Sequence, residues 1–119
     1  MKIKILEDTY SVMQYEKLPE NLPENYFSVI TEDEISILCK SSSAPKNALK
    51  IEGGMRGFRI EGELDFSLIG IIARITSIFA DNDISVFVVS SFKTDYFFVR
   101  EENLALSMQL LQASGYEIL

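Results

Sequence analysis

Histidine is absent from the 119-residue chain, and cysteine occurs once, as Cys39. The lack of histidine removes the commonest general base, the catalytic triads that contain one, and most zinc and copper sites. A single cysteine cannot form an internal disulfide, which favours a reducing compartment, the cytoplasm. Because Cys39 lies in an apolar run, we expect it to be a small buried hydrophobic side chain and not a reactive thiol. These absences argue against most familiar enzymes, and we expect no catalytic residue, no metal site and no cofactor.

Positive charge is also scarce, since 11 Lys and Arg stand against 18 Asp and Glu and the net charge is −7. A polyanion would be repelled by this average, so we expect no nucleic-acid partner. The longest apolar run, residues 84–89, is interrupted by Ser85 and is far shorter than the roughly 20 residues that cross a bilayer. The N-terminal residues are typical of a first strand and not of a signal peptide. We therefore expect no membrane partner.

The first half of the chain consists mainly of predicted strands and loops. The composition, 47% hydrophobic and 24% charged, is typical of a globular protein with one compact domain or two very small ones. Alternating residues or short apolar runs predict strands at 2–6, 10–16, 26–30 and 35–39, the last two as a hairpin. The sequence Leu-Pro-Glu-Asn occurs at 18–21 and again at 22–25. This repeat predicts a lengthened surface loop in preference to a proline-rich recognition motif.

The second half alternates strands and helices. Apolar residues at three- and four-residue steps predict an amphipathic helix from Leu68 to Ala80, with Ser67 as its N-cap. The predicted order is strand 58–64, helix 68–80, strand 84–91, strand 96–100, a helix ended by Gly115, and strand 116–119. This βαββαβ order predicts an α+β, ferredoxin-like fold, in which an antiparallel sheet carries both helices on one face. We expect the apolar strand 84–91 near the centre of that sheet.

Two further sets of residues have simple structural explanations. Gly53, Gly54 and Gly57 are expected in turns before strand 58–64, because no Gly-Lys-Ser/Thr follows them and a phosphate-binding loop is not indicated. Four arginines are expected to be solvated separately at the surface and not to form an anion-binding cluster: Arg56, Arg59, Arg74 and Arg100.

Three segments, 62–70, 84–87 and 90–96, resemble ACT domains of the arginine-sensor (CASTOR-like) type, which occur in small bacterial proteins. The resemblance implies two ACT-like units that share an antiparallel sheet. The first would be a degenerate N-terminal unit over 1–56, mostly strands, and the second a C-terminal ACT domain over 57–119.

The resemblance also suggests roles for particular residues. General ACT domains place a glycine just inside the first helix, in a loop that touches a bound amino acid, and Gly70 matches it. Their next strand is of the Ile-Ser-Ile type, which 84–86 matches. Asn82 and Asp83 stand where the family more often has a glycine, and both residue types can adopt the left-handed conformation.

The candidate ligand site begins at the start of the predicted helix. Its residues are Ser67, Leu68, Ile69, Gly70, Ser85, Val86, Phe87 and Asp95. Free N–H groups and the dipole of a helix start favour an anion such as an α-carboxylate, and a glycine lets a ligand approach the backbone. The strand edge at Ser85 would offer carbonyls to an α-ammonium, and Asp95 would neutralise a basic side chain. The residues alone equally allow Ser67 to be only a cap, Gly70 only a packing position, and Asp95 only a turn residue.

Two functions therefore remain open. The first is a non-catalytic regulatory module, a homodimer, that binds a small ligand, in the first place an amino acid, at the helix start. The alternative is a protein interaction or dimerisation module with no small-molecule ligand. An enzyme of ferredoxin-like fold, such as an acyl-phosphate hydrolase, is disfavoured because no single loop presents the arginine and asparagine that such a site requires.

Overall fold

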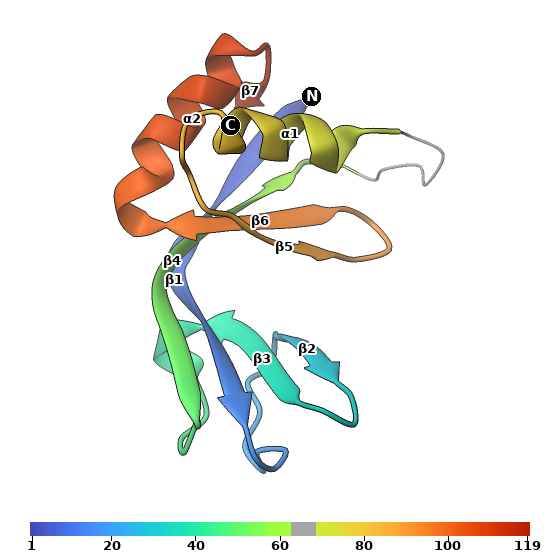
Figure 1. Cartoon of the computed structure of the whole chain (residues 1–119), viewed down its shortest axis with the longest axis vertical. Coiled ribbons are helices and arrows are strands. Elements are labelled where there is room, and N and C mark those ends of the chain that lie inside the picture. The colour runs from blue at the N-terminus through green and yellow to red at the C-terminus, as the bar shows by residue number, and fades with distance from the viewer. Residues whose placement is uncertain (63–68) are drawn as a thin grey trace. The chain divides into compact units, whose positions relative to one another are not determined.

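The computed structural model describes residues 1–62 and 69–119 of the chain (Figure 1). Two compact units are distinguished: unit 1 comprises Met1–Glu7 and Arg56–Leu119, and unit 2 comprises Asp8–Met55. Two long strands, β1 (Lys2–Tyr15) and β4 (Lys50–Ile60), contribute residues to both units.

Unit 1 has the predicted order of elements. After β4 come α1 (Ile71–Ala80), β5 (Phe87–Ser90), β6 (Asp95–Arg100), the 3-10 turn η2 (Glu101–Asn103), α2 (Leu104–Ala113) and β7 (Glu117–Ile118). The βαββαβ order and the α+β class are thus confirmed. Within this unit the strands lie in the order β7, β1, β4, β6, β5, and β1 runs parallel to β7. The first strand of the chain therefore separates two strands that a minimal ferredoxin-like sheet would place side by side.

Both helices pack on the same face of the unit 1 sheet. The ring of Phe58 on β4 stacks on Phe97 of β6, with centroids 5.1 Å apart, and meets Phe79 of α1 edge-on at 5.9 Å. The other buried members of this core come from β1, both helices and the connection after α1: Ile3, Ile60, Ile71, Ile75, Ile84, Val99, Met108 and Leu111. Each such side chain contributes roughly 1.5–3 kcal/mol on burial. Neither helix of the described residues has the length and apolar character needed to cross a membrane.

The opposite face of the same sheet is closed by a ring lying over a glycine. A Cβ at Gly57 would be 2.6 Å from the ring of Phe98 and 3.1 Å from the side chain of Leu6. Phe98 is only 1% exposed, although it points away from the helices. Gly57 therefore lies inside strand β4 and accommodates a close approach, so the prediction that it belongs to a turn before the strand was wrong.

Unit 2 is a sheet with a small core of its own. Its strands follow the order β2 (Phe27–Ile30), β3 (Ile35–Lys40), β1 and β4, and the predicted hairpin β2–β3 is confirmed as an antiparallel pair. The core consists of Met13, Tyr15, Ile37 and Cys39. Burial raises the pKa of the Cys39 thiol, which is 1% exposed, so the expected small hydrophobic role is confirmed. Residues 16–26 contain no helix or strand, as the prolines predicted.

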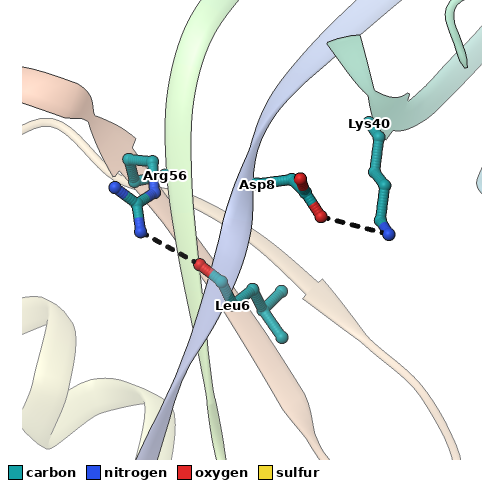
Figure 2. A network of polar contacts seen from close by, with 4 residues as sticks. All are labelled: Leu6, Asp8, Lys40 and Arg56. Carbon is teal, nitrogen blue, oxygen red and sulfur yellow. Dashed lines mark hydrogen bonds and ion pairs between the residues drawn. The ribbon is translucent and has the colours of Figure 1, made fainter. Parts of the chain in front are cut away.

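Strand β1 is continuous over Lys2–Tyr15, where two separate strands at 2–6 and 10–16 were predicted. The Asp8 carboxylate lies 3.1 Å from Nζ of Lys40 on β3, and the Leu6 carbonyl accepts a hydrogen bond of 3.3 Å from the Arg56 guanidinium (Figure 2). The Asp-Thr pair at 8–9 is therefore part of an extended strand, with the Asp8 side chain paired to the neighbouring strand β3. Strand β4 likewise begins at Lys50, eight residues before the predicted 58, so Gly53 and Gly54 lie within it as well.

Strand β5 was predicted near the sheet centre, and it lies at an edge of the unit 1 sheet instead. Only Phe87–Ser90 form the strand. Ile84 is buried in the helix-side core and Val86 packs against it, so the first half of the apolar run belongs to a connection. The run is apolar because it passes the core, and not because a strand is covered on both faces.

Both helices end in left-handed residues. Asp83 has φ 58°, and the N–H groups of Asp83 and Ile84 donate to the carbonyls of Ala80 (3.3 Å) and Phe79 (2.9 Å). Gly115, with φ 99°, closes α2 by the same pattern, as predicted. This is the Schellman arrangement, in which a residue without a Cβ is favoured. Asp83 thus occupies a left-handed position that a glycine would adopt at a lower conformational cost.

Replacing Asp83 by Gly should raise the free energy of unfolding by about 0.5–1 kcal/mol, because the left-handed conformation disfavours a side chain. Urea denaturation measures the change. Asp81→Gly is the matched control, since Asp81 has φ −64° and should lose about as much stability. An Asp83→Gly variant that is no more stable than the parent chain would contradict this account of the helix end.

Replacing Gly57 by Ala should destabilise the protein by about 2 kcal/mol, because the added methyl group overlaps the ring of Phe98. Adding Phe98→Leu to the Gly57→Ala variant should recover part of that loss, and a double-mutant cycle from chemical denaturation quantifies it. At Gly53 the nearest atom among the described residues is the Ser11 hydroxyl at 3.1 Å, so Gly53→Ala should cost much less. Equal losses at the two glycines would refute the close-approach explanation.

Candidate functional site

The start of α1 is formed by a glycine in a conformation that other residues rarely adopt. Gly70 is the N-cap, with φ 81° and ψ 11°, and no side chain of the described residues caps the helix. Its carbonyl accepts the first helical hydrogen bond, from the N–H of Arg74 at 2.9 Å. The amides of the first turn, at 71–73, are donors that the helix itself cannot satisfy, and they lie at the positive end of the dipole.

Arg74 brings a positive charge to the same helix start. Its Nη2 donates a 2.7 Å hydrogen bond to the carbonyl of Ile69. A Cβ on Gly70 would lie 3.6 Å from Nη2 and 3.7 Å from Nε, so the guanidinium lies against the glycine. We expected the Arg74 side chain to be solvated on its own at the surface. Its spacing of four residues from Gly70 is the sequence feature that could have indicated that the two lie together. Amides at a helix start and a guanidinium are both groups that bind anions in proteins.

The β5–β6 turn lies at the same end of unit 1. The buried hydroxyl of Thr94 donates to the carbonyl of Ile60, the last residue of β4, at 2.9 Å. Asp95 accepts a hydrogen bond from Oγ of Ser90 at 2.6 Å. In Figure 1 the beginning of α1 and the β5–β6 turn lie on the same side of this unit. The structure thus brings Asp95 to the end of the unit at which Ile69 and Gly70 lie.

The other predicted residues are placed differently. Ser85, Val86 and Phe87 follow the carboxyl end of α1, where the N–H of Ile84 bonds to Phe79. Along the chain, the whole of α1 and the turn after it stand between these residues and Gly70. Ser85 is exposed and Phe87 is 41% exposed.

The helix begins three residues later than predicted, at Ile71 and not at Leu68. Ser67, the predicted cap, and Leu68 lie outside the described residues. Ile69 is 85% exposed, so its side chain makes little contact with the core. The part of the predicted site that can be described is therefore a backbone site, with its charge supplied by Arg74.

The remaining arginines do not gather around this site. Arg56 donates to the Leu6 carbonyl, and Arg59 forms an ion pair of 3.2 Å with Glu61. Within 1–62 and 69–119, no three His, Cys, Asp or Glu side chains form a group that could hold a metal ion. The geometry of the helix start is suited to binding an anionic group by hydrogen bonds.

Solved structures with the same fold have been determined. A protein of Agobacterium tumefaciens superimposes with a TM-score of 0.88 at 29% identity, over 99% of this chain and 91% of that one. A Vibrio cholerae protein, described as a possible transport protein, gives 0.71 at 14% identity over 94% and 88%. The aspartate kinase of Clostridium acetobutylicum, described as an allosteric enzyme, gives a TM-score of 0.65 at 11% identity. That match covers 92% of this chain and 32% of the kinase.

Comparison with curated proteins gives no significant match. A family model described as the ACT domain matches residues 50–113, which is more than half of the 119 residues. The matched segment contains the whole helix start and the β5–β6 turn. The chain belongs to the ACT domain family.

Proposed function

We propose that this chain is a non-catalytic regulatory module that binds a small ligand, in the first place an amino acid, at the start of α1. ACT domains are regulatory parts of proteins, generally controlled by small molecules, and catalytic kinases carry them as separate parts. Membership of the family supports a binding role in general. The amino-acid class and the interest in Gly70 come from the resemblance to the family, and the geometry of this chain supports an anionic group at that position.

The observation that carries the proposal is the first turn of α1, which no side chain of the described residues caps, with a guanidinium beside it. An α-carboxylate placed there would accept hydrogen bonds from the amides of 71–73 and a charge-assisted bond from Arg74. Gly70 presents no side chain, so the ligand could approach the backbone closely. Asp95, at the same end of the unit, would attract a ligand with a basic side chain.

The α-ammonium of such a ligand requires acceptors that this end of the unit does not supply by itself. Ser85, Val86 and Phe87, which were expected to offer such acceptors, follow the carboxyl end of α1 in the same chain. In the homodimer that we propose, a second copy would provide these strand-edge carbonyls. The ligand would stabilise the dimer because it binds the dimer more tightly than the monomer.

We further propose that the chain is of the CASTOR-like type, with a degenerate first ACT-like unit over 1–56 and an ACT domain over 57–119. Support comes from the surplus of strands: unit 2, all of whose residues are described, contains β2, β3 and parts of β1 and β4 but no α-helix. The single free cysteine supports a cytoplasmic location for this protein.

The alternative is an interaction module without a ligand. It is favoured by the exposure of two large apolar side chains in unit 1, Ile69 at 85% and Phe92 at 73%. A partner protein would remove such side chains from water.

Thermal melts against a panel of the twenty amino acids test the proposal. A ligand present at 100 times its dissociation constant should raise the free energy of unfolding by about 2.7 kcal/mol. Arg74→Gln should remove most of that stabilisation, because the guanidinium contacts the proposed carboxylate position. Arg100→Gln, which removes the same charge at the far end of β6 from Asp95, should leave it unchanged.

Absence of any shift at millimolar concentrations would favour the interaction module. A shift that survives Arg74→Gln in full would show that a ligand binds elsewhere.

A further inference from the structure

Strand β2 forms one edge of the unit 2 sheet. Within the described residues it pairs only with β3, through the register Val29↔Ser36 and Ile30↔Ile35. The N–H of Thr31 donates to the carbonyl of Glu34 at 2.9 Å, which fixes the phase of the antiparallel ladder. Because hydrogen-bonded and non-bonded pairs alternate, Val29 bonds toward β3, and the N–H and C=O groups of Ser28 and Ile30 face away from it.

This edge strand is short, but it lacks two other devices that commonly protect an edge, charged side chains and proline. Its four residues, Phe-Ser-Val-Ile, include no charged residue and no proline. Val29 is 57% exposed and Ile30 is 58% exposed, and they point to opposite faces of the strand. An added strand would therefore find hydrogen-bonding groups at Ser28 and Ile30 and an apolar side chain on either face.

Carboxylates stand on both sides of β2 in the sequence. Six acidic residues in this region are exposed: Glu16, Glu20, Glu24, Glu32, Asp33 and Glu34. None of them takes part in an ion pair within the described residues, and Lys17 is the one cation among residues 16–34. In the sequence, β2 is therefore flanked on both sides by exposed carboxylates that form no ion pair within the described residues.

The charge decides which occupant fits. Antiparallel pairing of two β2 strands would bring Glu32 and Asp33 of one copy toward Glu24 of the other. Parallel pairing would bring Glu24 of one copy toward Glu24 of the other. Like charges opposite one another destabilise a strand pair. A strand with lysine or arginine at both ends would be attracted instead, and its encounter would be steered by the field.

We propose that the free edge of β2 binds an extended segment of a partner protein, with alternating apolar residues and basic ends, as an additional strand of the unit 2 sheet. The main-chain groups of Ser28 and Ile30 provide the affinity, and the acidic flanks select the partner. This surface lies in unit 2 and does not depend on a ligand at α1.

A fluorescent peptide, Lys-Lys-Val-Thr-Val-Thr-Val-Lys-Lys, is the probe, and anisotropy measures its binding to the full chain. We expect a dissociation constant of about 10–100 μM at low salt. Raising the NaCl concentration from about 50 to 500 mM should weaken the complex clearly, because it screens exposed charges. The same peptide with Glu in place of Lys should not bind at these concentrations.

Two variants locate the site. Ile30→Pro removes the edge-facing N–H without removing a bond to β3, and it should weaken peptide binding at least about tenfold. Ile30→Thr keeps the N–H and the β-branched shape, and it should bind much as the parent chain does. Glu32→Gln with Asp33→Asn should weaken binding about threefold for each charge removed. A thermal melt verifies that each variant is folded.

Equal binding of the acidic peptide, or unchanged binding by Ile30→Pro, would overturn the proposal. So would concentration-dependent dimerisation of the parent chain that Ile30→Pro abolishes, since a second copy would then cover the edge. If Ile30→Pro does not fold, a probe methylated on alternate amide nitrogens replaces it, and undiminished binding of that probe would exclude strand addition. Loss of amino-acid binding at α1 would leave these results unaffected.

Discussion

The contact of Phe79 with Phe58, which itself stacks on Phe97, determines where the other features of unit 1 lie. It joins α1 to the two central strands β4 and β6. Because Ile71 at the other end of α1 is also buried in this core, the helix is held along its whole length. The helix start at Gly70 is thereby kept at the end of the sheet where β4 finishes. The amides there face a fixed direction, which a binding site made of backbone groups requires.

The order of elements in unit 1 could be predicted because it depends on local patterns. The apolar spacing on α1 and Gly115 at the end of α2 are visible in a single sequence, and both are confirmed. Long-range pairing could not be predicted in the same way. No local sequence pattern indicates that Leu6 and Phe98 both lie against Gly57. No local pattern indicates that Lys2 pairs with Glu117 of β7. Such positions depend on which strands become neighbours.

The candidate site shows the same division. Gly70 was identified from its resemblance to a family glycine, and its left-handed conformation at the helix start is the physical reason for a glycine there. Arg74 was overlooked because a charged residue beside an apolar stripe is usually solvated, and only the structure places its guanidinium against Gly70. Ser85 was grouped with Gly70 by family motif, and in this chain the two residues stand on opposite sides of α1 in the sequence.

The central claim is that the first-turn amides of α1 hold the carboxylate of a ligand. Backbone amide NMR of the full chain, titrated with the amino acid that stabilises it most, tests this claim most directly. The account predicts that the largest shifts occur at the N–H groups of Ile71, Ile72 and Ala73 and at Nε–H of Arg74. Shifts confined to residues of unit 2, or to the carboxyl end of α1, would contradict it.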